Sequence, residues 1–489
     1  MSWAIYVTLL VPLVAALVSL LDGWRGARAA TVAAGLVALA LAVLLAIGVD
    51  HGRTLRTAHG WLRLDSLGAV FLVPTGLLYA TAGVFSIGYF AGREGEHGFQ
   101  GYARRYYALL NLFGWSMLLV PVAADFGTLW VAVELTTIIS ALLVAIDRTD
   151  AALEAAWKYV LIASCGLSIA LLAIIVLYAA GIGSLGNAYL PRFDRVLPVA
   201  GHFSADAVRV SFVLAIVGFG TKVGFVPTHT WLPDAHSEAP APVSALLSGA
   251  LLATAFYAIL RFFQVTVAAG DRAFGEHVLL VFGAFSLVAA SLFVLRQANF
   301  KRLLAYSSIE HMGVIALGIG FGAPLAVVGA LLHVITHASA KGLAFLGSGS
   351  LLRRYDTKEV DGVRGAATVM PFSGSAFMAA ALALSGLPLS GVFRSEFQIV
   401  SGGFGRAQYI PVALLIVFVN LAFFGVVWHV GRMVLTAPDR AGFSGEVSWW
   451  MVAGMAGCLF VVVALGLHVP TALSDLLSSA AHQLRVPSQ

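Results

Sequence analysis

The chain contains 489 residues, of which 60% are hydrophobic and 11% are charged, and its mean hydropathy is +0.92. Soluble globular proteins average about 45–50% apolar and about 25% charged residues, so this composition excludes a soluble protein. The net charge of +5 is spread over short loops, which argues against nucleic acid as a partner. The two cysteines, Cys165 and Cys458, lie in apolar runs and are too few for an iron–sulfur cluster, which normally takes four thiolates.

About fourteen apolar runs are long enough to cross a hydrocarbon layer, which takes about 20 residues per helix. In chain order they are Trp3–Leu21, Ala30–Ile47, Leu67–Tyr89, Tyr107–Val122, Phe126–Ile146, Trp157–Ala179, Ala207–Trp231, Val243–Phe263, His277–Leu295, Leu303–Gly320, Pro324–Leu346, Thr368–Phe397, Pro411–Val434 and Trp449–His468. These runs are continuously apolar, whereas the strands of a membrane β-barrel alternate. The sequence therefore predicts an all-α polytopic membrane protein, whose first run is a transmembrane helix and not a cleaved signal.

Basic residues are unevenly distributed between the predicted loops. Arginine gathers after the odd-numbered helices, for example at Arg25, Arg104, Arg148, Arg296 and Arg353, and is rarer after the even-numbered ones. Cytoplasmic loops of membrane proteins carry an excess of lysine and arginine. This pattern predicts that the odd loops are cytoplasmic and that both termini lie outside.

Lysine is used differently from arginine in this chain. Only five of the 29 basic residues are lysines, and four of them lie within or at the ends of predicted spans: Lys158, Lys222, Lys301 and Lys341. Arginine keeps its proton in proteins, whereas a buried lysine can release and rebind one. The placement favours amines that carry protons. For Lys158 and Lys301 the alternative is an amine that snorkels from a helix end to the surface.

Carboxylates are also expected inside the membrane. Glu134 lies in the middle of one run, Glu396 follows an interrupted run, and Glu310 lies beside His311. Charged groups at membrane depth are costly to insert and are functional candidates for that reason. Opposite a lysine, such a carboxylate can share a proton. For Glu134 the alternative is a structural hydrogen bond between helices.

Three titratable residues share one face of a predicted helix. His333, His337 and Lys341 follow one another at intervals of four residues, which stacks their side chains. Histidine titrates near neutral pH, so this face can pass protons. No metal site is predicted, because zinc would need a third strong ligand and Val334 and Ile335 replace the centre of an HExxH motif. Haem ligation by the two histidines stays open as an alternative.

Two predicted spans are interrupted by glycine and proline. The interrupting residues are Gly224, Pro227, Gly386 and Pro388. Lys222 lies beside the first break and Glu396 follows the second. Broken helices at membrane depth are tolerated where they line protein or water-filled cavities. A matched pair of breaks, one in each half of the chain, is typical of transporters built from inverted repeats.

Three segments carry a resemblance to a known family: FGTKVGFVPTHTWLPDAHSEAPAPVSALLSG, FKRLLAYSSIEHMG and HVITHASAKGLAFLGSGS. They resemble the antiporter-like subunits of respiratory complex I and of cation antiporter complexes, and the resemblance covers roughly Ala108–Ile399. Within this family, WVAVELTTIISALLVAI and ALEAAWKYVLIASCG are most similar to the F subunit of hydrogenase-4 and of related formate hydrogenlyase complexes.

The resemblance implies a fold of about 14 helices with two inverted five-helix repeats, in which helices 7 and 12 are broken. Residues 1–105 would hold helices 1–3, residues 106–266 the first repeat (helices 4–8), residues 276–434 the second repeat (helices 9–13), and residues 449–489 helix 14 and a short tail. Together with Lys158, the residues predicted to carry protons are Glu134, Lys222, Lys301, His333, His337, Lys341 and Glu396.

In this family, Glu134 and Lys222 would form the ion pair of a half-channel and would pass protons toward the second half of the chain. Family members often place a histidine or lysine in helix 8, between the half-channels. Here Ser248 and Ala253 occupy those positions. The candidate relays are therefore Ser248, Tyr257, Glu310 and His311.

The sequence thus predicts a proton-translocating, non-redox subunit of a larger redox complex, hydrogenase-4-like or complex I-like, in the cytoplasmic membrane of a prokaryote. We expect no cofactor in this chain, and we expect as partners other membrane subunits, nickel–iron hydrogenase subunits and iron–sulfur subunits. Whether the chain by itself counts as an enzyme stays open. The alternatives are a Na⁺(K⁺)/H⁺ antiporter subunit, the proton channel of an inorganic-carbon uptake complex, and a haem- or quinone-binding subunit of a membrane enzyme.

Overall fold

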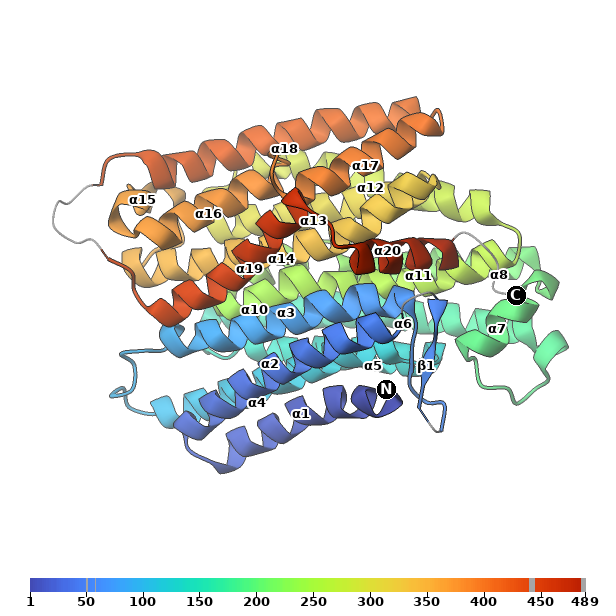
Figure 1. The fold of residues 1–489 in the computed structure, drawn as a ribbon, viewed down its shortest axis with the longest axis horizontal. Helices are drawn as coiled ribbons and strands as arrows, with labels where there is room; N and C mark the ends of the chain where they lie inside the picture. The colour runs from blue at the N-terminus through green and yellow to red at the C-terminus, as the bar shows by residue number, and fades with distance from the viewer. Residues whose placement is uncertain (50–51, 58, 439–444, 485–489) are drawn as a thin grey trace.

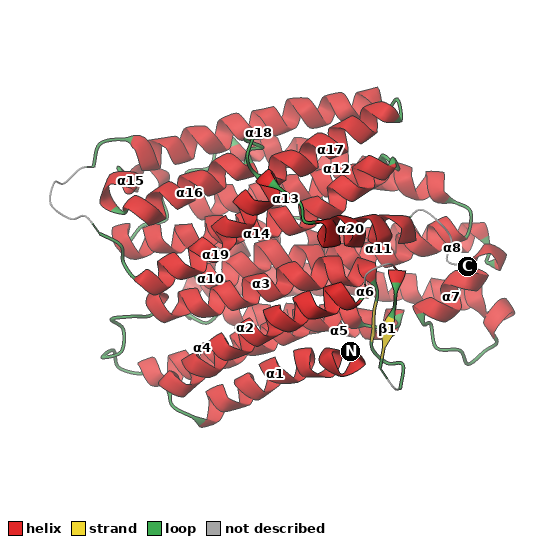
Figure 2. Cartoon of the chain, in the orientation of Figure 1, coloured by secondary structure: helices red, strands yellow, loops and turns green. Residues whose placement is uncertain are grey.

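The computed structural model describes residues 1–49, 52–57, 59–438 and 445–484. Nearly all of these residues are helical, and the helices run alongside one another in an elongated bundle (Figures 1 and 2). A short antiparallel sheet of β1 (Leu55–Arg56) and β2 (Arg63–Leu64) pairs Leu55 with Leu64. The all-α fold predicted from the apolar runs is confirmed.

The first half of the chain forms the helices up to α11. Their bounds are α1 (Ser2–Leu21), α2 (Trp24–Gly48), α3 (Ser66–Tyr89), α4 (Phe99–Leu119), η2 (Val120–Val122), α5 (Phe126–Val144), α6 (Asp150–Leu185), α7 (Phe193–Val199), η3 (Ala200–His202), α8 (Ala205–Val223), α9 (Trp231–Glu238), α10 (Ala241–Leu246), η4 (Leu247–Leu251) and α11 (Leu252–Ala268). The seventh predicted span corresponds to α8 with α9. The eighth is a continuous run of α10, the π-helical turn η4 and α11.

The second half of the chain forms the remaining helices. Their bounds are α12 (Arg272–Val294), α13 (Phe300–Gly320), α14 (Pro324–Tyr355), η5 (Val360–Gly362), α15 (Ala366–Val369), α16 (Pro371–Leu384), α17 (Gly391–Gly405), α18 (Tyr409–Leu435), α19 (Trp449–Leu467) and α20 (Thr471–Gln483). The twelfth predicted span corresponds to α16 with α17. The short tail predicted after the last span contains a further helix, α20.

Eleven helical segments of the described residues are long and apolar enough to cross a membrane. They account for every predicted span except α4, α8 and the α16–α17 pair. α4 carries Arg104 and Arg105, α8 carries Asp206, Arg209 and Lys222, and α16 and α17 contain 14 and 15 residues. Each predicted run therefore coincides with helix, while the number of membrane crossings and the repeat symmetry stay predictions.

The most buried helices form the centre of the bundle. The most apolar window of α10–α11 is completely buried, and that of α13 is 94% buried, compared with 28% for α18 and 39% for α1. The outer helices expose large apolar side chains, for example Leu10, Ile175 and Phe424. An apolar outer face around a polar interior is the arrangement that a lipid bilayer requires.

Irregular backbone separates two pairs of helices. α8 stops one residue before Gly224, whose φ of +87° lies in the left-handed region, and Pro227 lies in the segment that leads to α9. Gly386, with φ of +68°, and Pro388 lie between α16 and α17. The hydroxyl of Ser390 then caps α17 by accepting a backbone hydrogen bond. Both breaks therefore lie where glycine and proline predicted them.

A buried ion pair joins three helices near one end of the bundle. Asp65, which caps α3, accepts a hydrogen bond from Arg261 Nη2 of α11 at 2.7 Å, and both side chains are 1% exposed. Burial by itself raises the pKa of Asp65, but the charges of Arg261 and Arg63 hold it below its ordinary value. Arg261 also donates to Tyr257 and Gln264, and Gln264 in turn donates to the end of α20.

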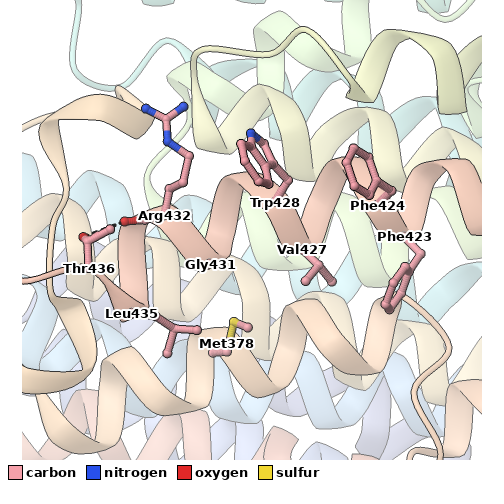
Figure 3. Close-up of a pocket in the computed structure, with 9 residues that line it drawn as sticks. All are labelled: Met378, Phe423, Phe424, Val427, Trp428, Gly431, Arg432, Leu435 and Thr436. Carbon is pink, nitrogen blue, oxygen red and sulfur yellow. Dashed lines mark hydrogen bonds between the residues drawn. The ribbon is translucent and has the colours of Figure 1, made fainter.

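An apolar groove lies on the outer surface between α18 and α16 (Figure 3). Its volume is about 400 Å³, and it is lined mainly by apolar side chains such as Met378, Phe424 and Trp428. At one end of the groove, the hydroxyl of Thr436 donates to the backbone carbonyl of Arg432 at 2.8 Å. None of the predicted proton-carrying residues lines this groove, so the candidate site lies elsewhere.

The backbone of the first break can be tested by replacing Gly224 with alanine. A left-handed conformation costs an L-residue about 1–2 kcal/mol, and the added Cβ would come within 2.5 Å of Leu232 Cδ1. We expect Gly224→Ala to lower the free energy of unfolding by at least that amount, seen as a lower Tm in detergent. Gly183→Ala in α6 is the control, because its Cβ would meet no atom within 4 Å. Equal Tm values for the two variants would show that the left-handed backbone at position 224 does not require glycine.

The ion pair can be tested with Asp65→Asn. This change leaves the buried guanidinium of Arg261 without a counter-charge, which typically destabilises a protein by about 3–5 kcal/mol. We expect a large loss of thermal stability in detergent. Glu96→Gln provides the control, because it removes an exposed ion pair with Arg93 that is worth at most about 1 kcal/mol. If both variants unfolded at the same temperature, the Asp65–Arg261 pair would not hold this end of the bundle together.

Candidate functional site

The structure buries eight of the predicted titratable residues, and we refer to them as the buried row. They are Lys222, Lys301, Glu310, His311, His333, His337, Lys341 and Glu396. They come from α8, α13, α14 and α17. Glu134 is only half-buried and Lys158 is exposed.

The first buried amine lies where α8 breaks. Lys222 is in the last turn of α8, and its ammonium donates hydrogen bonds to Thr137 Oγ1 and, at 2.9 Å, to the hydroxyl of Tyr159. The hydroxyl of Tyr159 lies 2.8 Å from Ser140 Oγ. The ring of Tyr159 also faces the ammonium, which is 5.2 Å from its centroid. Neutral groups of α5 and α6 therefore hold Lys222 in place.

Glu134 lies one helical turn before Thr137 on α5. One carboxylate oxygen accepts a hydrogen bond from Ser164 at 3.1 Å, and the other is buried without a partner. Glu134 interacts electrostatically with Lys222, but among the described residues no ion pair joins them. The direct ion pair implied by the family resemblance is therefore not formed, because the amine contacts the next turn of α5 instead.

Lys158 lies at the surface of the bundle. Its side chain is 45% exposed and forms ion pairs with Glu154 at 2.6 Å and Asp234 at 3.4 Å. Asp234 pairs in turn with Arg302 at 2.9 Å, and these groups line a polar cavity of about 380 Å³. Lys158 is only two turns from the start of α6, so its long side chain reaches the surface, as in the snorkelling alternative.

Lys301, in the first turn of α13, binds the end of α9. Its ammonium donates to the backbone carbonyls of Ser237 at 3.0 Å and Ala239 at 2.6 Å. Carbonyls at the C-terminus of a helix carry partial negative charge, which suits an ammonium. His236 precedes these carbonyls, is buried with its Nε2 unpartnered, and interacts electrostatically with both Lys301 and Lys341. His236 is therefore a further buried titratable residue, and its energy depends on the charges of both amines.

Lys341 lies in the middle of α14. Its ammonium donates to the backbone carbonyl of Leu304 and to Ser307 Oγ, both at 2.8 Å. Ser308 also donates to the Leu304 carbonyl, at 3.0 Å, and its hydroxyl lies 2.8 Å from that of Ser248. Ser248 belongs to η4, and such π-helical turns are frequent at functional sites. The candidate relay Ser248 is thus connected to Lys341 through α13.

Tyr257, a second candidate relay, belongs to the buried ion pair described above. Its hydroxyl accepts hydrogen bonds from Arg261 at 2.7 and 3.0 Å and donates to the backbone carbonyl of Pro121 at 3.1 Å. These contacts use the donor and both lone pairs of the hydroxyl. The structure therefore places Tyr257 in the Asp65–Arg261 cluster and not beside the buried lysines.

Three histidines and Glu396 meet where α13, α14 and α17 pack together. His311 Nδ1 lies 3.1 Å from His333 Nε2 and 3.9 Å from Glu396 Oε1. The ring of His337 lies 5.1 Å from that of His311, and both of its nitrogens are without a partner. The predicted face of α14 therefore exists, and a third histidine from α13 packs against it.

Glu396 connects this cluster to the second helix break. Its side chain is 11% exposed and lines a cavity of about 260 Å³ together with Ser385 and Gly386. A Cβ at Gly386 would come within 2.5 Å of Glu396 Oε2, so only glycine allows this approach. Glu310 interacts electrostatically with both Glu396 and Lys341. The charge of the Glu310 carboxyl therefore acts on both Lys341 of α14 and Glu396 of α17.

Three residues of this arrangement were not predicted from the sequence: Tyr159, Ser307 and His236. Tyr159 directly follows Lys158 in the sequence and, unlike Lys158, is buried. Ser307 lies three residues before Glu310, at a spacing that puts both on one helix face. His236 lies within the longest of the segments that carry the family resemblance. A search for polar residues at helical spacing from Glu310 would have found Ser307.

The sequence matches a known family over most of its length. Residues 123–425 match the family described as NADH:quinone oxidoreductase/Mrp antiporter, TM. The Hydrogenase-4 component F homolog of Methylacidiphilum infernorum (isolate V4) is 34% identical over 419 residues, which cover 83% of this chain and 85% of that protein. NADH-quinone oxidoreductase subunit N of Desulforudis audaxviator (strain MP104C) is 31% identical over 396 residues, which cover 78% and 77% of the two chains.

The fold has close counterparts among solved structures. A chain of the Mrp complex from Dietzia sp. DQ12-45-1b aligns with a TM-score of 0.87 and 20% identity, covering 100% of this chain and 98% of that chain. At this identity the likeness concerns the fold alone. The family resemblance predicted from the three sequence segments is confirmed. With a family match over more than half of its residues, the chain belongs to the NADH:quinone oxidoreductase/Mrp antiporter transmembrane family.

Proposed function

We propose that this chain moves protons across the membrane as a non-redox subunit of a larger membrane complex. The environment of Lys222 and Lys341 carries the proposal, because both amines are fully buried and their hydrogen-bond partners in the described chain are hydroxyls and a carbonyl. A hydroxyl that accepts a hydrogen bond from an ammonium can donate one to the neutral amine after the proton has left. The contact therefore survives both protonation states. Arginine keeps its proton and would offer only one state.

The first part of the pathway is built from hydroxyls. Ser140, Tyr159 and Lys222 follow one another at 2.8 and 2.9 Å, which are hydrogen-bond distances. The charge of Glu134 favours the ammonium form of Lys222 without neutralising it by contact. Protonation of Glu134 removes this attraction, so a proton arriving there promotes release from Lys222. The separation of the two groups makes this control electrostatic.

The second part of the pathway is built from carboxyls and imidazoles. Lys341 and Glu396 are related through Glu310, which interacts electrostatically with both. His311 then lies within 3.9 Å of Glu396 and within 3.1 Å of His333. An imidazole can accept a proton on one nitrogen and release one from the other. This part therefore delivers protons to the cavity beside Glu396.

His236 and Lys301 occupy the region between the two parts. The carbonyls that bind Lys301 follow directly after His236, and the charge of Lys341 also acts on this imidazole. A change of charge on either amine therefore changes the electrostatic energy of His236. Ser248 and Ser308 provide a further hydroxyl contact on the side of Lys341. We propose these groups as the connection that the family usually builds from a titratable residue in helix 8.

The outer face of α5 supports the proposal that other membrane subunits cover this chain. Val131 and Ile138 are exposed on either side of Glu134, which places Glu134 on an outward face. A carboxylate on a face exposed to lipid is costly, whereas a neighbouring subunit that covers α5 would remove this exposure. The names of the two relatives given above point to hydrogenase-4 and to an NADH–quinone oxidoreductase. Redox subunits, including nickel–iron hydrogenase and iron–sulfur proteins, would then supply the free energy.

We also propose that the chain carries no redox cofactor of its own. Its two cysteines are an exposed Cys165 and a buried Cys458, too few for an iron–sulfur cluster. Both ring nitrogens of His333 lie within hydrogen-bond distance of neighbours, His311 and Ser395. Haem ligation by His333 would have to break one of these contacts. The second candidate function is a cation/proton antiporter subunit, which the Mrp members of the matching family favour.

Proton transfer can be measured in vesicles that contain the assembled complex. We expect Lys222→Ala to lower the rate of energy-driven acidification by a factor of roughly 100 or more, as is typical when a positioned proton carrier is lost. Lys222→Arg should be equally impaired, although it keeps the charge, because arginine does not release its proton. Arg209→Ala is the matched control, since Arg209 lies on the same helix as Lys222 and pairs with Asp271 outside the buried row. Normal acidification by Lys222→Arg would contradict the proposal that Lys222 releases and rebinds a proton. Acidification that depends on sodium would favour the antiporter.

A C-terminal tag tests both the partners and the orientation. After gentle detergent extraction, we expect nickel–iron hydrogenase and iron–sulfur subunits to co-purify with the tagged chain. Recovery of small membrane subunits alone would instead indicate a cation/proton antiporter, and a zinc-enzyme partner would indicate inorganic-carbon uptake.

The distribution of arginine predicts that both termini lie outside. An antibody should therefore reach the tag on cells whose cytoplasmic membrane is intact, and labelling that requires its permeabilisation would reverse the orientation.

A further inference from the structure

Three side chains of metal-binding type converge from three different helices. One ligand atom each from His311 of α13, His333 of α14 and Glu396 of α17 lies within 4.8 Å of the other two. His311 Nδ1 is 3.1 Å from His333 Nε2 and 3.9 Å from Glu396 Oε1. Zinc bonds nitrogen and oxygen at about 2.0–2.2 Å in a tetrahedron, which puts neighbouring ligand atoms roughly 3.3–3.5 Å apart. The third pair of ligand atoms, His333 and Glu396, lies within 4.8 Å, so Glu396 would have to move toward the imidazoles by up to roughly 1.5 Å for all three atoms to bind one ion.

Ser395 holds His333 in the orientation that a metal ligand needs. The Ser395 hydroxyl donates to the backbone carbonyl of Val392 at 2.7 Å and lies 2.9 Å from His333 Nδ1. Because its single hydrogen is used, Ser395 accepts from Nδ1, so His333 carries its proton there. The lone pair of His333 Nε2 then points at His311. Metal-binding histidines almost always donate their second N–H to such a partner.

Several polar atoms of this cluster have no hydrogen-bond partner although they are buried. They are Glu396 Oε1, His311 Nε2 and both ring nitrogens of His337. Buried polar atoms are normally satisfied, and exceptions call for an explanation such as an ion. Glu396 Oε1 is the oxygen that faces His311. The atom most in need of a partner is therefore a member of the three-ligand set.

An ion can reach these atoms from the cavity beside the second helix break. Glu396 lines this cavity of about 260 Å³, together with Ser385 and Gly386 of the break and Asn420 of α18. The hydroxyl of Ser385 is unpartnered and the glycine leaves the Glu396 carboxylate uncovered. Of the three ligand residues, Glu396 is the one that lines this cavity, so an ion entering from it meets the Glu396 carboxylate first.

We propose that His311, His333 and Glu396 form a binding site for a divalent transition-metal ion of the Zn²⁺ type, with the fourth position open to water. Two imidazoles and one carboxylate are a common ligand set for zinc sites with an open position, and imidazole ligands favour transition metals over Mg²⁺ or Ca²⁺. The bound ion occupies the nitrogen and oxygen atoms that the proposed pathway uses, so it blocks the second part of that pathway. This consequence rests on the proposed function, whereas the binding itself does not.

Metal binding can be followed with Co²⁺, whose visible absorption reports tetrahedral nitrogen and oxygen ligands, as a difference spectrum of the complete complex purified in detergent after loosely bound ions have been removed by dialysis. We expect one equivalent of Co²⁺ per chain that Zn²⁺ displaces. His333→Gln and Glu396→Gln should weaken Zn²⁺ binding by roughly 100-fold or more, and Ser395→Ala by roughly 10–100-fold, because it removes only the orienting group. His429→Gln is the matched control, since that imidazole is bound to the Gly425 carbonyl of α18.

Two results would overturn the site. One is the absence of saturable Co²⁺ binding in the unaltered complex, and the other is unchanged Zn²⁺ affinity in both His333→Gln and Glu396→Gln. Each variant is first checked for an unchanged Tm, and Ser395→Ala supplies a milder change should the others fail to assemble. Saturating Zn²⁺ should also stop proton transfer in the unaltered complex. Stoichiometric binding with undiminished transfer would support the metal site and would remove these three residues from the proposed pathway.

Discussion

An ionisable group inside this bundle loses the hydrogen bonds that water forms with it at the surface, and the protein has to replace them. The structure does this in two ways. At the start of α3, Asp65 pairs with the buried Arg261 at 2.7 Å and with Arg63 at 3.1 Å. The ammonium groups of Lys222, Lys301 and Lys341 instead donate hydrogen bonds to hydroxyls and carbonyls. The first solution locks a charge in place and joins helices. The second arrangement solvates the ammonium ion without neutralising its charge, so the amine can still release its proton.

A helix end and the second helix break meet the same demand. Most carbonyls of a continuous helix are bonded to its own N–H groups, whereas those of the last turn are free to bind a buried ion. At the end of α9, the carbonyls of Ser237 and Ala239 are free to bind Lys301. At the second break, Gly386 gives up its side chain so that the carboxylate of Glu396 can lie against the backbone. The irregular segments thus provide the polar surroundings that make a titratable residue tolerable within apolar helices.

Most of the fold follows from the sequence, because apolar length and glycine or proline interruptions are local properties. They predicted every long helix, both breaks, and the shared face of His333, His337 and Lys341. The partners of the lysines depend on how helices pack, and the sequence did not give these. Tyr257 was a candidate relay across helix 8 and contacts Arg261. For Lys158 the sequence left open a buried amine or one that snorkels from a helix end, and its side chain reaches the surface two turns after the start of α6.

The order of chemical groups along the chain of contacts has a physical logic. The carboxylates, Glu134 and Glu396, lie near the outer faces of the bundle, and the amines lie at its centre. A carboxylate is neutral when it holds a proton, and an amine is neutral when it lacks one. Loading a proton at an outer carboxylate therefore removes a negative charge near an amine, and the amine is then less able to keep its own proton. At Glu134 a change of charge thus acts on the amine of Lys222 through electrostatics alone, whereas at Glu396 it acts first on Glu310, the buried acid that interacts with Lys341.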